Sequence, residues 1–275
     1  MTDRTALYVY ALLRHGADAA DGVTGLDGRP LRLLHVPGTQ LAALVHDAAP
    51  TPFQGGDEQV RRWVAEQNEA VTTVWERTGS LLPMTFNVLV ADASPDADSP
   101  DGPAADGGPS AEERLAHWVR EQAPEITERL DELSGRCELR VEIALDRSAA
   151  VAHAASSKLT AEVAGRSPGM RRLLAKRQEQ EAKNAAGLLA DSLHAEIRHD
   201  LLTVAEDLRE RGSAHTGPDE TGVLSAALLV RDEDIDAVGS LLSALRIREP
   251  SARIRFLGPW PPYSFTDDRY SSYEK

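Results

Sequence analysis

The pattern closest to a catalytic motif is Gly165-Arg166-Ser167-Pro168-Gly169, which matches the Gly-x-Ser-x-Gly elbow that presents the nucleophilic serine of α/β hydrolases. In those enzymes the residue after the serine donates its backbone N–H to the oxyanion hole, and Pro168 has no N–H. No buried strand precedes Ser167, whereas a serine cap followed by a proline in the first helical turn explains the same residues. We therefore expect Ser167 to cap a helix, and a Ser167 hydrolase stays only as the alternative function.

Two other groups carry metal-ligand side chains, but at the wrong spacing. His194 and His199 are five residues apart in a predicted helix and point about 140° away from each other, whereas helical ligand pairs are four residues apart. The stretch Asp96–Gly102 starts like a calcium loop, but Pro100 occupies its fifth place and Gly107 the place of the ligand glutamate. The sequence therefore predicts no metal site, no cofactor and no catalytic residue.

Charge and composition narrow the classes of partner. The 275 residues include 44 acidic and 30 basic side chains, which gives a formal net charge of -14. Clustered Lys and Arg bind nucleic acid and anionic membrane surfaces, so neither is an expected partner. No apolar run reaches the roughly 18 residues of a membrane span, and the first residues do not resemble a signal peptide. The single cysteine, Cys137, is expected to be a buried thiol, and we expect a cytoplasmic protein.

The periodicity of the first half predicts strands that alternate with helices. A β-prone run precedes a hairpin around Pro37-Gly38, an amphipathic helix that stops at Gly79, a strand, and a second helix that begins at the capping box Ser110-Ala111-Glu112-Glu113. Before that box, residues 92–109 are mostly Asp, Pro, Ser, Ala and Gly, and predict a flexible acidic insertion. The strands are expected at 6–13, 31–36, 41–46, 81–90 and 137–145.

These elements predict an α+β fold with two domains. Mostly antiparallel strands with helices on one face give a modified ferredoxin-like N-terminal domain, because a hairpin stands where a helix is usual. The second half predicts a helix over Met170–Arg211, a strand over 223–230, a helix over 234–246 and a strand over 251–257. The expected N-terminal domain covers residues 1–147. The expected C-terminal domain covers residues 148–275 and is an α+β domain with a long helix, a β-α-β unit and a Pro/aromatic tail.

The tail after the last predicted strand combines prolines with aromatic residues. Proline fixes φ and donates no backbone hydrogen bond, so this segment is expected to be extended and stiff. Two interpretations stay open: the tail buries Trp260 and Phe265 in its own molecule, or it presents a docking surface to another protein. The segment is Gly258-Pro259-Trp260-Pro261-Pro262-Tyr263-Ser264-Phe265.

This octet resembles the C-terminal signature of the gas vesicle protein GvpL/GvpF family. Other segments resemble that family in the same order along the chain: Tyr8-Val9-Tyr10, Leu82-Pro83-x-x-Phe86, Ser167-Pro168-Gly169 and Val223–Val230.

The chain departs from the family pattern at two places. Thr85 and Asn87 flank Phe86 where the family has an arginine and a glycine, and Asn68 stands where a helix histidine is expected.

The resemblance implies an accessory or minor structural protein that acts in gas vesicle formation and has no catalytic activity. Family members contact the small hydrophobic main shell protein, so the implied partners are this shell protein and other gas vesicle accessory proteins. The implied location is the cytoplasm, in association with gas vesicles. The candidate partner-binding or interdomain residues are Tyr8, Tyr10, Pro83, Phe86, Gly258, Pro259, Trp260, Pro261, Pro262, Tyr263 and Phe265.

Overall fold

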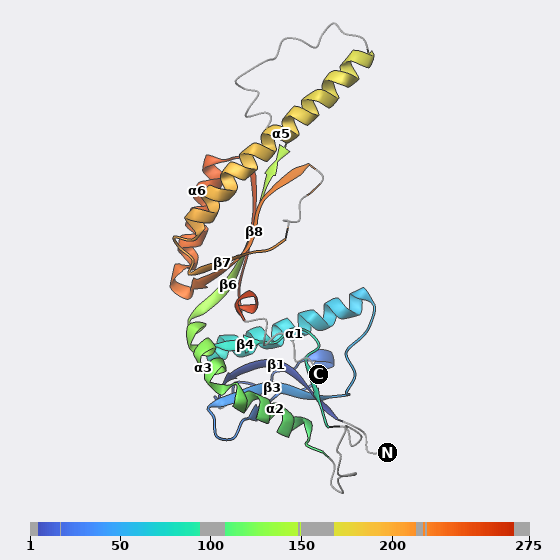
Figure 1. The fold of residues 1–275 in the computed structure, drawn as a ribbon, viewed down its shortest axis with the longest axis vertical. Helices are drawn as coiled ribbons and strands as arrows, with labels where there is room; N and C mark the ends of the chain where they lie inside the picture. The colour runs from blue at the N-terminus through green and yellow to red at the C-terminus, as the bar shows by residue number, and fades with distance from the viewer. Residues whose placement is uncertain are drawn as a thin grey trace. The chain divides into compact units, whose positions relative to one another are not determined.

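The computed structural model describes residues 5–16, 18–93, 108–147, 149, 168–212, 217 and 219–266. The chain forms two compact units (Figure 1): residues 1–136 together with 260–275, and residues 137–259. The sequence-based boundary at residue 147 follows a strand that groups with the second unit, whereas the end of the chain groups with the first. The first unit is therefore discontinuous in sequence.

The first unit is an antiparallel sheet with helices. Its strand order is β2-β3-β1-β4, and β5 also pairs with β1. This is the ferredoxin-like order, with a loop and a short 3-10 helix in place of the first helix, as expected from the early hairpin. The elements are β1 (Ala6–Arg14), η1 (Leu26–Gly28), β2 (Arg32–His35), β3 (Leu41–Ala48), α1 (Asp57–Thr78), β4 (Leu81–Pro83), β5 (Leu89–Ala91), α2 (Ala111–Glu121), α3 (Ala123–Glu132) and η3 (Tyr263–Phe265).

Helices cover both faces of this sheet. Figure 1 shows α1 on one side of β1 and β3 and α2 on the other. The residues from Ala6 to Leu13 are all buried, as a strand between two helical layers requires. Tyr8 and Tyr10 belong to the same core cluster as Val71 and Val74 of α1. Our expectation of helices on one face is therefore wrong for this unit.

Local signals place the helix ends where the sequence predicts them. Gly79 caps the C-terminus of α1 at a φ of +69°. Ser110 and Glu113 form the capping box of α2, in which each side chain accepts the other residue's backbone N–H. The strand expected over 81–90 is interrupted, because the chain turns at Phe86-Asn87 between β4 and β5. Pro83 ends β4 at the edge of the sheet, where a missing N–H is tolerated.

The second unit has the full ferredoxin-like element order β-α-β-β-α-β. Its strand order is β7-β8-β6-β9, the same permutation as in the first unit. The ion pair between Arg248 of α6 and Glu196 of α5 joins its two helices, which Figure 1 shows against the sheet. The elements are β6 (Arg136–Asp146), α5 (Pro168–Leu201), β7 (Asp207–Glu210), β8 (Glu220–Arg231), η2 (Asp232–Asp234), α6 (Ile235–Arg248) and β9 (Ala252–Trp260).

The long helix is shorter than its apolar stripe suggested. It begins at Pro168 and ends at Leu201, and Leu208 lies instead in β7, which the sequence did not predict. Leu193 and Ile197 of α5 are buried, as the stripe predicts. Among the helices of the described residues, none combines the length and the apolarity that crossing a bilayer requires.

Candidate functional site

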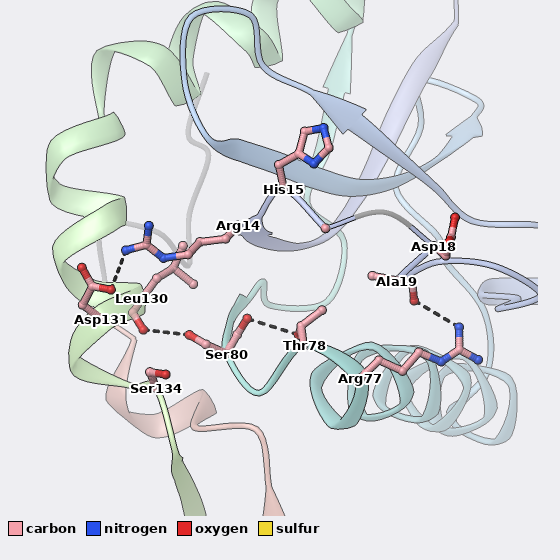
Figure 2. A pocket seen from close by; sticks show the side chains of 11 residues that line it. Arg14, His15, Asp18, Ala19, Arg77, Thr78, Ser80, Leu130, Asp131 and Ser134 are labelled. Carbon is pink, nitrogen blue, oxygen red and sulfur yellow. Dashed lines mark hydrogen bonds and ion pairs between the residues drawn. The ribbon is translucent and has the colours of Figure 1, made fainter.

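A polar pocket of about 460 Å³ lies in the first unit, between the end of β1, the C-terminal end of α1 and the end of α3 (Figure 2). Figure 2 shows Arg14 and Arg77 on opposite sides, with Thr78 and Ser80 between them. The lining residues are Arg14, His15, Gly16, Asp18, Ala19, Arg77, Thr78, Ser80, Leu130, Asp131 and Ser134.

The hydroxyl groups of this pocket donate to backbone carbonyls. Ser80 Oγ donates to the Leu130 carbonyl at 2.7 Å, and Thr78 Oγ1 donates to the Val74 carbonyl at 2.8 Å. Each hydroxyl thus uses its proton in a bond to a carbonyl, whereas a serine or threonine nucleophile gives its proton to a neighbouring base. These bonds favour a structural role for both hydroxyls.

The two guanidinium groups are also held in place. Arg14 Nη2 lies 2.5 Å from Asp131 Oδ1, and Arg77 Nη1 donates to the carbonyls of Ala19 at 3.1 Å and Asp21 at 2.8 Å. Cations fixed in this way can orient a polar or anionic group that enters the pocket. The pocket is therefore lined by two cations that already form bonds within the first unit.

The residues that the sequence analysis weighed as metal ligands or nucleophiles are described only in part. Within the described ranges, no group of three or more His, Cys, Asp or Glu side chains could hold a metal ion. His194 Nε2 instead lies 3.3 Å from Glu210 Oε2 of β7. Burial and the neighbouring Asp232 raise the pKa of Cys137 to about 12, so this thiol is a poor nucleophile. Ser167 and most of the acidic insertion lie outside the described residues, and Pro168 is the first residue of α5.

Three of the sequence candidates meet in one aromatic cluster of the first unit. The ring centroid of Tyr8 lies 4.9 Å from that of Tyr10 and 6.4 Å from that of Phe86. Phe53 and His46, which the sequence did not single out, complete this cluster at 5.5 and 5.4 Å from Tyr8. Tyr8 and Tyr10 are fully buried, so they can act on a partner only by positioning the residues around them.

The tyrosine hydroxyls of the cluster are fully hydrogen-bonded. Tyr8 Oη donates to Gln67 Oε1 at 2.6 Å and accepts the backbone N–H of Asn87 at 2.9 Å. Tyr10 Oη accepts the backbone N–H of Leu26 at 2.9 Å and lies 2.9 Å from His46 Nδ1. These bonds connect β1 to α1, to β3, to the loop before β5 and to η1, and thereby fix the loops around the cluster.

Asn87 explains one departure from the family pattern. Its φ is +72°, a left-handed conformation that glycine adopts freely and that asparagine tolerates better than most residues. Its side chain also accepts the backbone N–H of Phe53 at 2.9 Å and donates to the Phe53 carbonyl at 3.0 Å. Asparagine therefore tolerates the conformation that the resemblance assigns to a glycine, and its side chain adds two hydrogen bonds to the loop.

Changing Asn87 to alanine is expected to destabilise the first unit by about 2–3 kcal/mol, because the left-handed backbone becomes strained and both bonds to Phe53 are lost. Asn87→Gly relieves the strain and should cost less than Asn87→Ala. Urea unfolding of the two variants measures the difference. Equal losses for the two would show that backbone conformation does not matter at this position.

His46 gives the first unit an acid-sensitive stability. Burial, reinforced by Arg29, lowers the pKa of His46 to about 4. Because the folded pKa lies below the unfolded value of about 6.5, the stabilisation is present above pH 6.5 and is lost as the pH falls towards 4. The loss in the free energy of unfolding is expected to be on the order of 3 kcal/mol. His46→Gln should flatten this part of the stability profile relative to the wild type, and identical slopes from pH 7 to 4 would contradict the assignment.

The tail is divided between the units. Gly258 and Pro259 are exposed in β9 of the second unit, whereas the chain belongs to the first unit from Trp260 onwards. There Pro261 and Pro262 are buried, and Phe265 is only 1% exposed. Tyr263 packs against the aromatic core cluster, and Arg129 of α3 donates a hydrogen bond to the Phe265 carbonyl. This part of the tail is a structural element of the first unit.

Comparison with known proteins gives a match along nearly the whole chain. The model of the family described as gas vesicle synthesis protein GvpL/GvpF matches residues 6–267. The chain is 27% identical to gas vesicle protein L2 of Halobacterium salinarum over 256 residues, which cover 89% of this chain and 84% of that protein. It is 23% identical to gas vesicle protein L of Haloferax mediterranei over 260 residues, which cover 89% of this chain and 73% of that protein.

Two crystal structures share the fold. Gas vesicle protein GvpF from Anabaena sp. aligns with a TM-score of 0.67 and 15% identity over 98% of this chain and 100% of that one. Gas vesicle protein GvpF from Microcystis aeruginosa aligns with a TM-score of 0.63 and 18% identity over 94% of this chain and 98% of that one. At these identities the likeness establishes the fold.

Proposed function

The chain belongs to the gas vesicle synthesis protein GvpL/GvpF family and takes part in gas vesicle formation, and on this premise we propose that it binds the hydrophobic main shell protein. Exposed apolar, strand-forming surfaces aggregate unless another protein covers them. In this proposal the chain covers such surfaces of the shell protein until the subunits join the growing shell.

The observation that carries the proposal is the extent of the family match, residues 6–267, which includes both units and the tail. The chain also exposes apolar side chains on the second unit, among them Leu188, Ile247, Phe256 and Leu257. Other gas vesicle accessory proteins are further proposed partners, and the proposed location is the cytoplasm, at the gas vesicle.

The proposed role is not enzymatic. The polar pocket presents hydroxyls that donate to carbonyls, and Pro168 removes the donor that a Ser167 hydrolase would need. If the role is binding alone, Ser167→Ala leaves gas vesicle formation intact and abolishes no esterase activity. Ester hydrolysis that disappears in this variant would favour the hydrolase instead.

Affinity purification of the tagged full chain from cells that make gas vesicles tests the proposal. The shell protein should co-purify with the tagged chain, and deletion of this chain's gene in a strain without paralogues should abolish vesicles, with recovery when the gene is restored. Normal vesicle assembly in the deletion strain would contradict the proposal. In the same assay, a Trp260→Ala variant with an unchanged melting curve and lost shell-protein binding would assign the tail to the docking surface.

A further inference from the structure

Among the strands that the structure describes, β9 lies at one edge of the second unit's sheet. It comes last in the order β7-β8-β6-β9, so one of its sides pairs with β6 and, among the described strands, none pairs with the other. Its outward N–H and C=O groups can therefore form a ladder with a further strand. At nine residues, β9 is also long enough to accept a strand of ordinary length.

The side chains of this edge are accessible on both faces. Phe256 is 39% exposed and Leu257 is 49% exposed. Because consecutive residues of a strand point to opposite faces, an added strand would find apolar surface on each side of the sheet. Single exposed apolar residues are common on proteins, but two in succession on an unpaired edge strand form an aggregation-prone edge unless a partner covers them.

Two arginines give this edge a charge preference. Arg253 and Arg255 share one face of β9 and pair inward with β6, where Arg253 Nη2 lies 2.8 Å from Asp146 Oδ2 and Arg255 Nη1 lies 3.6 Å from Glu142 Oε2. Both arginine side chains remain more than half exposed. A strand added on the outer side would therefore place two of its side chains next to these half-exposed arginines, which favours carboxylates at those two positions.

The opposite edge of the same sheet is protected. Strand β7 has four residues, and its Glu210 is held by His194 and Arg198 of α5. A short, charged edge strand that a helix restrains is a poor template for pairing. The contrast between the two edges points to β9 as the docking edge of this unit.

We propose that β9 binds an extended segment of the shell protein by strand addition, with carboxylates of that segment beside Arg253 and Arg255 and apolar side chains on Phe256 and Leu257. This inference rests on the proposed function, because it names the surface that binds the shell protein. The added ladder ends at Gly258, whose φ of +121° leaves the strand conformation, and at Pro259, which has no N–H to donate. Residues 253–257 therefore form the docking edge.

The variants for the test change charge or edge chemistry in the full-length protein. Arg253→Glu combined with Arg255→Glu reverses the charge of the edge, and Leu257→Lys places a charge in its apolar part. The matched control is Arg61→Glu with Arg246→Glu, which makes the same change in net charge at two exposed helical sites. Melting curves of all variants confirm that they are folded before binding is measured.

We expect the edge variants to bind purified shell protein at least about tenfold more weakly than the wild type and the control. A second probe is an eight-residue peptide of alternating valine and aspartate, with a valine and lysine peptide as its counterpart. The aspartate peptide should slow amide hydrogen exchange at residues 253–257 of the wild type, and the lysine peptide should not.

The two measurements separate the inference from the function on which it rests. Shell-protein binding that is equal in the wild type, the edge variants and the control would overturn the docking edge and leave the proposed function standing. Protection by the aspartate peptide without any shell-protein binding would support β9 as an acidic-strand site and overturn its assignment to the shell protein. Absence of both effects would overturn the inference and the shell-protein role together.

Discussion

Replacing Gly258 by alanine is expected to destabilise the second unit by about 3–5 kcal/mol. A Cβ at this position would lie 2.8 Å from the backbone oxygen of Glu138 and 3.0 Å from Leu139 Cδ2, both in the neighbouring strand β6. The φ of +121° adds backbone strain for any residue with a side chain. Neither atom can move away without a large loss of stability, because one is a backbone oxygen and the other belongs to a buried leucine.

Denaturant unfolding followed by probes of the second unit measures this loss. Gly239→Ala is the matched control in the same unit, because Gly239 lies within α6 and an added Cβ there meets no atom within 4 Å. This control should keep or raise stability, since alanine favours a helix over glycine by about 1 kcal/mol. Similar stabilities of the two variants would mean that β9 does not approach β6 as closely as described.

Phe265→Ala is expected to destabilise the first unit by about 3–5 kcal/mol, because it removes a fully buried aromatic side chain and leaves a cavity. The hydrogen bond from Arg129 to the Phe265 carbonyl uses the backbone, so it does not compensate for the lost packing. Thermal unfolding of the full chain measures the effect. The variant also separates packing of the tail from docking, since it deletes a ring that is not accessible to a partner.

Phe256→Ala is the control for this second experiment, because it makes the same chemical change at a residue that is 39% exposed. It should cost less than about 1 kcal/mol, as expected for the loss of a partly exposed side chain. If Phe265→Ala and Phe256→Ala lower the thermal stability by the same amount, Phe265 does not anchor the tail.

Much of the fold follows from short local signals. The capping box at Ser110 and Glu113 and the glycine stop at Gly79 are decided within a few residues, so sequence alone locates those helix ends. The uninterrupted apolar run of β1 is typical of a strand that is buried on both faces, a signal that our expectation of helices on one face did not use. Strand β7 was missed because Leu208 continues the apolar spacing of α5, and only pairing with β8 makes it a strand.

The aromatic cluster was only partly predictable. Its tyrosines and Phe86 carry the family resemblance, and Gln67 occupies a place on the buried stripe of α1 where a polar side chain needs a partner. Phe53 stands in an irregular segment without periodicity, so no local pattern could bring it to Tyr8. Gly258 belongs to the second unit and Phe265 to the first, although both lie in one octet. Long-range contacts decide this division, and composition does not encode them.

The discontinuity of the first unit has a consequence for its biosynthesis. The ribosome completes β1 to α3 early, but residues 260–266 emerge only after the whole second unit. At about 5–20 residues per second, that interval is on the order of ten seconds. Throughout it the nascent first unit lacks Tyr263 and Phe265, so part of its apolar core stays uncovered. A chain released early by premature termination would retain this exposed surface, which makes it a substrate for chaperones and proteases.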